Sequence, residues 1–373
     1  MKKVGICTFY NNNNYGSYLQ SFALIEKVKS MGFDSYLIDF ADYSKVWNKR
    51  LKYSTILNRF KCLLLNPSLL VETIKAKIIS RDSILCPADL QNKFKAFSQN
   101  YLSFYNDNYI KDDFAAFIVG SDQVWKVTMP GLHQVFFLRF CSPLKRISYA
   151  ASLGSDEIPN YNKKQLFRYL NEFKAISVRE DTAVSLLNSE EYDLNPIQVL
   201  DPVLLVGRCF WEQYIQPVCH EKYIFLYFLD SISSTQRQLN KIIAQYPGYK
   251  LICAHTGVKI DGFDVEYIMP SPLEFVSLVK NCFAMITDSF HGTAFSIIFD
   301  KNFYVLPRNY KIYGGQKDRI LSLLRMFNCV DRLLLNPESL SKVKPLDVND
   351  IHCTLTSNQI VSNAFLNDAL TNK

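Results

Sequence analysis

Short apolar runs rich in Val, Ile, Phe and Tyr alternate along this chain with longer segments in which apolar residues recur at helical spacing. The runs have the length of buried strands, and the intervening segments are long enough to cross between parallel strands. This alternation is typical of a parallel sheet with helices on both faces. It predicts strands at 3–9, 34–39, 114–119, 146–151, 175–179, 197–200, 223–229, 249–254, 283–287 and 303–306.

The segments between these runs predict helices at 16–31, in parts of 55–81, and at 88–100, 162–173, 180–188, 233–245, 272–281, 292–299 and 317–327. The series restarts after Asp201-Pro202, so we expect an α/β fold of two doubly wound, Rossmann-like domains that face a cleft. The first would span 1–204, with a basic helical insertion at about 42–112, and the second 205–373, with a C-terminal helical tail. Functional residues are expected in the turns after the strands, where open α/β sheets bind ligands.

Composition excludes several classes of protein. The hydrophobic content of 48% is enough for sizeable cores, but no apolar stretch reaches the roughly 20 residues that span a bilayer. The ten cysteines are scattered, without C-x-x-C pairs or Cys/His spacings suited to zinc. We therefore expect a cytoplasmic protein with reduced thiols and without a metal site.

One segment carries the whole excess of positive charge. Residues 45–81 contain nine Lys or Arg and one Glu, a net charge of +8, against +7 for the entire chain. The charges are interleaved with Leu, Ile and Phe, as in a basic amphipathic helix. Two interpretations stay open: contact with an anionic membrane surface or a phosphate-bearing acceptor, or a solvated insertion whose charges aid solubility.

Two turns of the first domain carry candidate ligand-binding groups. The turn before Gly16 holds four asparagines, which offer amide groups to a ligand or simply cap the following helix. It lacks the G-x-G-x-x-G and Walker patterns of nucleotide sites. Strand 114–119 ends in Gly120-Ser121-Asp122-Gln123-Val124-Trp125, whose crowded polar groups indicate a site, although Asp122 could equally cap a turn.

Three further turns supply charge. Arg179 ends strand 175–179 and is suited to a bidentate grip on phosphate or carboxylate, or to an ion pair with Glu180 or Asp181. Strand 283–287 turns at Asp288-Ser289-Phe290-His291-Gly292 into an apolar helix, which places a titratable imidazole at a helix N-terminus. Lys317 and Arg319 follow Gly314-Gly315 and could complete an anion site or be solvated. The turn from Asp288 to Gly292 is not a G-x-S-x-G nucleophile elbow, which disfavours a serine hydrolase.

Taken in order, these segments resemble the polysaccharide pyruvyl transferase family from residue 4 to about 330. The segments that carry the resemblance are Asn14-Tyr15-Gly16 with Leu19-Gln20, Gly120 to Trp125, Ser148-Tyr149-Ala150-Ala151-Ser152-Leu153-Gly154, Ser177-Val178-Arg179-Glu180, Asp201-Pro202 and Asp288 to Gly292. The resemblance implies a fold similar to the GT-B glycosyltransferases, phosphoenolpyruvate as donor and a sugar acceptor. Its product would be a pyruvate ketal on a capsule or exopolysaccharide precursor.

The resemblance also implies roles for individual residues. His291 would be the key catalytic histidine, and Arg179 would bind the donor's anionic groups. From the needs of the reaction we further expect His291 to act as acid or base and Asp288 to orient it. Some family members carry an arginine where this chain has Ser289, so the anion must be bound elsewhere. The expected donor-binding set is Arg179 of the first domain with Ser289, Gly292, Thr293, Lys317 and Arg319 of the second. The expected acceptor-binding set of the first domain is Asn14, Tyr15, Gly16, Gln20, Ser121, Asp122, Gln123 and Trp125.

Two alternatives accompany this hypothesis. A GT-B-type glycosyltransferase with a nucleotide-sugar donor would use the same cleft, and a catalytically silent family member would only bind a glycan. For the transferase, phosphoenolpyruvate is a co-substrate, and no cofactor, metal or nucleic-acid partner is expected. The acceptor would be lipid-linked or nucleotide-linked, and residues 45–81 would allow peripheral contact with the inner face of the membrane.

Overall fold

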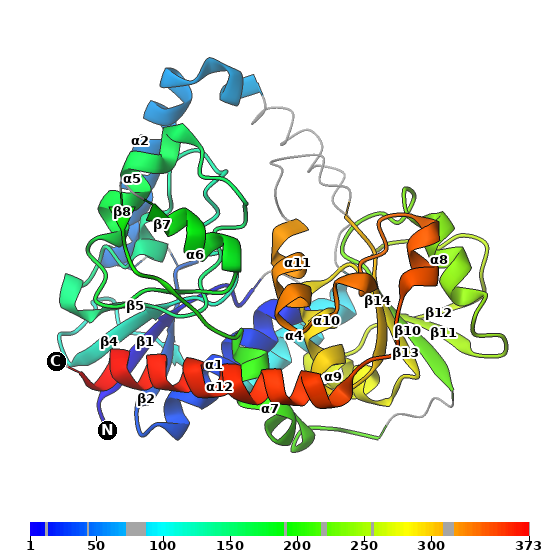
Figure 1. Cartoon of the computed structure of the whole chain (residues 1–373). Coiled ribbons are helices and arrows are strands. Elements are labelled where there is room, and N and C mark those ends of the chain that lie inside the picture. The colour runs from blue at the N-terminus through cyan, green and yellow to red at the C-terminus, as the bar shows by residue number, and fades with distance from the viewer. Residues whose placement is uncertain are drawn as a thin grey trace.

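The computed structural model describes residues 1–11, 14–42, 45–71, 87–189, 192–217, 222–254, 257–308 and 317–372. Within these ranges the chain forms two five-stranded parallel sheets, each flanked by helices (Figure 1). None of the helices in the described part of the chain combines the length and the apolar character needed to cross a bilayer.

The first sheet has the strand order β3-β2-β1-β4-β5. Its strands are β1 (Lys3–Cys7), β2 (Asp34–Ile38), β3 (Phe104–Tyr105), β4 (Phe114–Val119) and β5 (Arg146–Ser148). The central strand β1 lies between β2 and β4 and is buried from Val4 to Cys7, as its apolar sequence predicts. Gly5 allows this packing, since a Cβ there would overlap the ring of Phe117 on β4.

The second sheet repeats this arrangement with the order β12-β11-β10-β13-β14. Its strands are β10 (Tyr223–Tyr227), β11 (Lys250–Ala254), β12 (Val265–Ile268), β13 (Ala284–Thr287) and β14 (Asn302–Val305). The helices of this half are α8 (Gln236–Ile243), α9 (Pro272–Asn281), α10 (Phe290–Ile298) and α11 (Lys317–Met326). A capping box between Ser271 and Glu274 fixes the start of α9.

The helices of the first half include one that joins the two sheets. They are α1 (Tyr15–Ser30), α2 (Val46–Leu65), α4 (Ala88–Tyr101), α5 (Asn160–Leu170) and α6 (Asp181–Leu187). Helix α1 packs against α9 and α10 of the second half and against α7 (Pro202–Glu212). One hydrophobic core therefore includes residues of both sheets, with a smaller cluster on the outer side of the second sheet.

The C-terminal helix α12 (Val348–Thr371) runs below both halves (Figure 1). The backbone N–H of Leu200 donates to Ser362 Oγ at 2.9 Å, and Lys174 Nζ donates to the carbonyl of Ala369 at 3.0 Å. The expected helical tail of the second domain is thus attached to the first half as well. The boundary expected between residues 204 and 205 lies inside α7 and stays a prediction.

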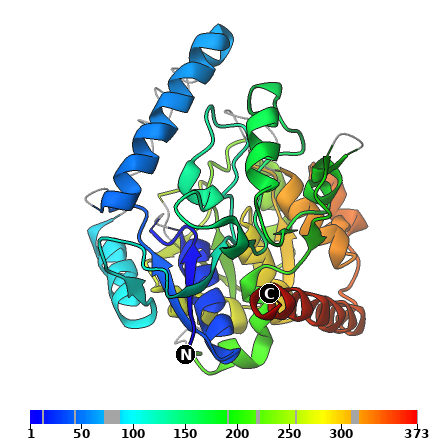
Figure 2. The ribbon, with the colours of Figure 1, turned by 90° about the vertical axis from the view of Figure 1, so that its left-hand side faces the viewer.

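Several elements differ from the sequence-based expectation. The strands expected at 175–179 and 197–200 are short, β6 (Ser177–Val178) and β9 (Ile197–Gln198), and they form a two-stranded sheet of their own. Among the described residues, only isolated bridges, Ile147 to Ala175 and Ala151 to Val178, link this pair to the edge of the first sheet. A second small pair joins β7 (Asn188–Ser189) to β8 (Tyr192–Asp193). The helix expected in parts of 55–81 begins earlier, as α2, and residues 72–86 lie outside the described part. Figure 2 shows α2 projecting from the edge of the molecule.

Candidate active site

A cavity of about 500 Å³ lies between the two halves of the molecule. Its lining follows the carboxyl ends of β1, β4, β10, β13 and β14, as expected for ligand sites of open α/β sheets. The polar part of the lining includes Asn14, Ser17, Asp122, His291, Arg308 and Arg319. The apolar part includes Phe9, Phe40, Trp125, Phe136 and Phe137. A cavity of this size is large enough for a small anion together with a sugar ring.

His291 lies at the junction of the two halves. It is the second residue of α10, whose first turn is capped by Ser289. The imidazole packs directly on the N-terminal turn of α1, and a Cβ at Gly16 would overlap its ring. Gly16 was expected to bind a ligand; the structure gives it a different task, because only glycine lets the two helix N-termini approach so closely. The positive ends of both helices therefore point towards the cavity.

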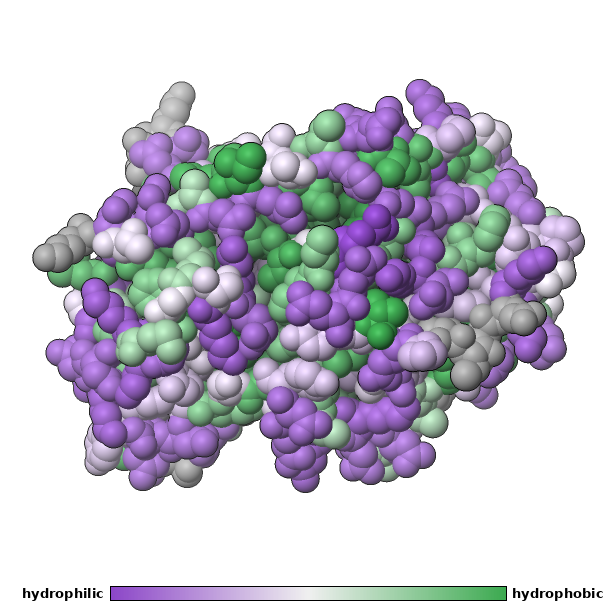
Figure 3. Space-filling view, turned by 90° about the horizontal axis from the view of Figure 1, so that it is seen from below, coloured by the Kyte–Doolittle hydropathy of each residue, from purple (hydrophilic) through white to green (hydrophobic). Residues whose placement is uncertain are grey.

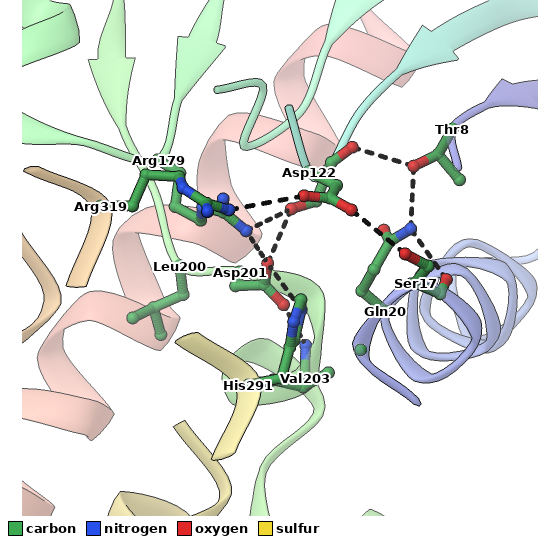
Figure 4. Close-up of polar contacts among 12 residues, drawn as sticks. Thr8, Ser17, Gln20, Asp122, Arg179, Leu200, Asp201, Val203, His291 and Arg319 are labelled. Carbon is green, nitrogen blue, oxygen red and sulfur yellow. Dashed lines mark hydrogen bonds and ion pairs between the residues drawn. The ribbon is translucent and has the colours of Figure 1, made fainter. Parts of the chain in front are cut away.

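Asp201 is the carboxylate beside this histidine. Its Oδ2 lies 3.6 Å from His291 Nε2 and accepts hydrogen bonds from Ser121 Oγ at 2.7 Å and Arg179 Nη1 at 2.8 Å (Figure 4). Burial would raise the pKa of Asp201, but the charges of His291 and Arg179 and the Ser121 hydroxyl hold this pKa below its ordinary value. A buried, ionised carboxylate thus lies next to the imidazole.

Arg179 belongs to this buried support rather than to the cavity wall. Its Nε lies 3.1 Å from Glu180 Oε1, and its guanidinium lies 4.0 Å from the centre of the Phe290 ring. Burial would lower the pKa of Arg179, but Glu180 and Asp201 raise it, so the side chain is a permanent cation. The expected grip of Arg179 on a donor is replaced in this geometry by its ion pair with Asp201.

Asp288 has other partners than the expected histidine. Its carboxylate accepts the backbone N–H groups of Leu229 at 2.8 Å and Asp230 at 3.0 Å, and it lies 3.2 Å from Arg308 Nε. Burial raises the pKa of Asp288 above its ordinary value, against the opposing effect of Arg308. Asp288 therefore positions Arg308 and the turn after β10, and the expectation that it orients His291 is corrected in favour of Asp201.

Asp122 belongs to the first half and lines the same cavity as His291. Its backbone adopts a left-handed conformation with φ of 69°, which costs on the order of 1–3 kcal/mol for a residue with a Cβ. The carboxylate accepts from Ser17 Oγ at 3.3 Å and lies 3.9 Å from Arg319 Nη1 on α11. The strained turn thus holds an acidic group at the cavity, between elements of both halves.

The cavity carries an excess of positive charge. Among the described residues that line it are four Lys or Arg side chains, Arg59, Lys126, Arg308 and Arg319, against the single carboxylate of Asp122. Burial and then the charge of Arg319 lower the pKa of Lys126. Sequence reasoning singled out Arg319 but missed Arg308, although Arg308 follows the end of β14 just as the expected residues follow their strands. The arrangement favours an anionic ligand.

The remaining expected residues make hydrogen bonds and packing contacts within the protein. Tyr15 donates to the carbonyl of Pro270 at 3.0 Å and stacks on Phe275, and Gln20 donates to Thr8 Oγ1 at 2.9 Å. Thr293 Oγ1 donates to the carbonyl of Ser289 at 3.0 Å. The N–H of Gly292 donates to Ser289 Oγ at 3.4 Å, so it is already occupied.

Two expected acceptor residues and one donor segment complete the account. Gln123 and Trp125 line the cavity, but the Trp125 indole is 1% exposed and donates to the carbonyl of Phe136 at 2.8 Å. Its face is therefore covered rather than open to a sugar. Residues 12–13, residues 309–316 and the side chain of Lys317 lie outside the described part.

The family profile that describes polysaccharide pyruvyl transferases matches residues 14–310. The chain belongs to this family. The match includes Asn14, Asp122, Asp201, His291 and Arg308, so the family sequence covers both walls of the cavity. The resemblance noted from the sequence motifs is thereby confirmed.

Two solved structures are similar to this chain. The S. aureus MnaA-UDP structure is 12% identical, with a TM-score of 0.50, and the similarity covers 99% of this chain and 96% of that one. The UDP-GlcNAc 2-epimerase from Methanocaldococcus jannaschii is 12% identical over 92% of both chains, with a TM-score of 0.46. A search of curated proteins finds no match. This member of the family has the GT-B type of α/β fold, as expected.

The described residues contain no group of three or more His, Cys, Asp or Glu side chains arranged to hold a metal ion.

Proposed function

We propose that the protein transfers pyruvate from phosphoenolpyruvate to two hydroxyls of a saccharide, forming a ketal during surface-polysaccharide biosynthesis. The observation that carries this proposal is the pairing of His291 with the buried, ionised Asp201 at the wall of a cation-lined cavity. The reaction needs an acid, a base and an anion-binding site, and the cavity brings such groups together.

The donor would lie on the cationic side of the cavity. Phosphoenolpyruvate carries a phosphate and a carboxylate, which Arg308 and Arg319 can bind through charge-assisted hydrogen bonds. The N-termini of α1 and α10 add positive potential to the same region. Arg308 would thus bind the donor in place of Arg179, which is paired with Asp201.

The proton transfers can be assigned to His291 and Asp122. Protonated His291 gives its proton to the methylene carbon of the donor, and the first sugar hydroxyl adds to the neighbouring carbon while Asp122 takes its proton. Phosphate then leaves, and the second hydroxyl closes the ketal. Of the two hydroxyl protons, one ends on the new methyl group and the other on phosphate. Asp201, whose Oδ2 lies 3.6 Å from His291 Nε2, would hold the imidazole in position.

The acceptor sugar would lie on the aromatic side of the cavity. Phe9, Phe40 and Phe136 pack against one another there, with ring centres 4.9–6.0 Å apart. Apolar ring faces suit the C–H face of a sugar. Arg59 of α2 lines the same cavity and is suited to an anionic group carried by the acceptor.

Ligand-dependent thermal stability tests the donor class. Phosphoenolpyruvate should raise the Tm of the wild-type protein and leave that of Arg308→Gln nearly unchanged, because a ligand that binds only the native state stabilises it. Phosphate release should then appear only when a saccharide acceptor is added. A Tm rise with nucleotide sugars alone would instead support glycosyl transfer, and saccharide binding without turnover would support a silent family member.

A further inference from the structure

Helix α2 exposes a row of large apolar side chains. Tyr53, Leu57, Phe60 and Leu64 follow one another at spacings of three or four residues, so they lie on one face of the helix. Phe60 is 59% exposed and Leu64 is 64% exposed. Ile56 beside the row is also exposed. Scattered apolar residues on a surface are ordinary, whereas a continuous row marks an interaction site.

The opposite side of α2 fixes the helix to the molecule. Leu51 is buried, and Thr55 Oγ1 accepts the backbone N–H of Gln134 at 3.2 Å. Arg59 packs on Gly131, where a Cβ would come within 2.6 Å of the helix backbone. Thr55 and Arg59 line the cavity. The helix therefore forms part of the site on one side and presents its apolar row to the outside on the other.

The charge of α2 selects the kind of partner. Its sequence contains five Lys or Arg and no Asp or Glu. Lys49, Arg50 and Lys61 flank the apolar row and are exposed. This combination of an apolar face bordered by cations is that of a helix that lies in the interface of an anionic bilayer.

We propose that α2 docks the protein on the surface of a bilayer that contains anionic lipids. The apolar row enters the boundary between headgroups and acyl chains, and the flanking cations bind the headgroups. A second copy of this chain suits the same face less well, because two such helices would bring five cations against five. On the face seen from below, hydrophilic residues predominate and the apolar residues form separate groups (Figure 3).

Docking would place the cavity close to the lipid headgroups, because α2 lines the cavity on one side and would contact the headgroups on the other. A saccharide linked to a membrane lipid could then reach the cavity without leaving the bilayer. This last step rests on the proposed function, whereas the docking itself does not, because vesicle binding requires no substrate.

The test is co-sedimentation of the full chain with vesicles. Binding is expected with phosphatidylcholine mixed with phosphatidylglycerol, and little with phosphatidylcholine alone. Lys49→Gln with Lys61→Gln should weaken the partition about thirtyfold, and added salt should weaken that of the wild type. Phe60→Glu with Leu64→Glu should abolish binding.

A matched control separates docking from general changes of surface. Ile360 on α12 is 66% exposed on another face, so Ile360→Glu should bind vesicles like the wild type. All variants should keep the Tm of the wild type. The proposal is overturned if anionic vesicles do not bind the protein, or if Phe60→Glu with Leu64→Glu binds normally. It is also overturned if the wild type is a dimer in solution and Phe60→Glu with Leu64→Glu makes it monomeric.

Discussion

Asp201 and Asp288 are both buried carboxylates paired with an arginine, yet their surroundings shift the two pKa values in opposite directions. Asp201 lies among Arg179, His291 and Ser121, and its pKa is lowered. Asp288 has Arg308 and two backbone N–H groups as partners, and its pKa is raised. Burial raises the pKa of both groups, and only at Asp201 do the charged and hydroxyl partners together outweigh it. The number of cationic and hydroxyl partners therefore sets the direction of each pKa shift, and the carboxylate with the lowered pKa lies beside the imidazole.

Removal of the imidazole should have the largest effect. His291→Ala is expected to lower kcat for pyruvyl transfer about 10³-fold, within the range for loss of a general acid or base. Phosphate release from phosphoenolpyruvate in the presence of acceptor measures this. The Tm should stay close to that of the wild type. Wild-type turnover in this variant would end the assignment of His291.

Neutralising the two carboxylates compares the regions directly. Asp201→Asn should destabilise the protein by about 3 kcal/mol, because a buried ion-pair partner of Arg179 is lost. Asp288→Asn has the same change in shape but should cost less than about 1 kcal/mol, since the site already disfavours the charge. Denaturant unfolding of both variants checks the order. Equal losses would mean that the two regions do not differ as described.

A methyl group at the junction tests the close approach of the two halves. Gly16→Ala places a Cβ where the imidazole lies, so it should displace His291 and lower kcat about 10²-fold. The control is Ser30→Ala at the far end of α1, which is exposed and should leave kcat unchanged. Unchanged kcat in Gly16→Ala would show that the imidazole position is not limiting.

Loss of a cavity cation should affect donor binding more than turnover. Arg308→Gln is expected to raise the KM for phosphoenolpyruvate about tenfold, the value of one charge-assisted hydrogen bond. Arg237→Gln on the exposed surface of α8 removes the same charge and should leave KM unchanged. If both variants raised KM equally, the effect would be one of overall charge rather than of the cavity.

The smallest expected effect is on the pH dependence of stability. The raised pKa of Asp288 makes the native state prefer the protonated form, so this contribution is present below the unfolded value near pH 4 and is lost as pH rises. The lowered pKa of Asp201 contributes stability above about pH 4 that is lost as pH falls. Relative to wild type, Asp288→Asn should remove the first slope and Asp201→Asn the second. Parallel Tm curves between pH 3 and 6 would contradict this.

Most of the architecture could be predicted from the sequence because the central strands, such as β4 and β10, are apolar runs that end in polar turns. β12 was missed because Val265–Ile268 is a partly exposed edge strand without an apolar run. α7 was missed because it contains Pro202 and Gly207, and Gly207 has a positive φ inside the helix. Both cases are ones in which tertiary packing overrides the local pattern.

The site was predicted in part, for a similar reason. Sequence position shows which residues follow a strand, so Asn14, Asp122 and His291 were correctly placed at the cavity. It does not show which side of the turn a side chain faces. Arg179 faces inwards to Asp201, while Arg308 faces the cavity. That choice depends on partners distant in the sequence and is visible only once the chain is folded.

The contact between Gly16 and His291 ties the position of the imidazole to the packing of the two halves. The glycine belongs to α1 and the histidine to α10, so a relative movement of the two sheets would change the surroundings of the ring. Helix α12, attached to both halves, limits such movement. The position of the imidazole therefore depends on how the N-terminal turns of α1 and α10 pack against each other.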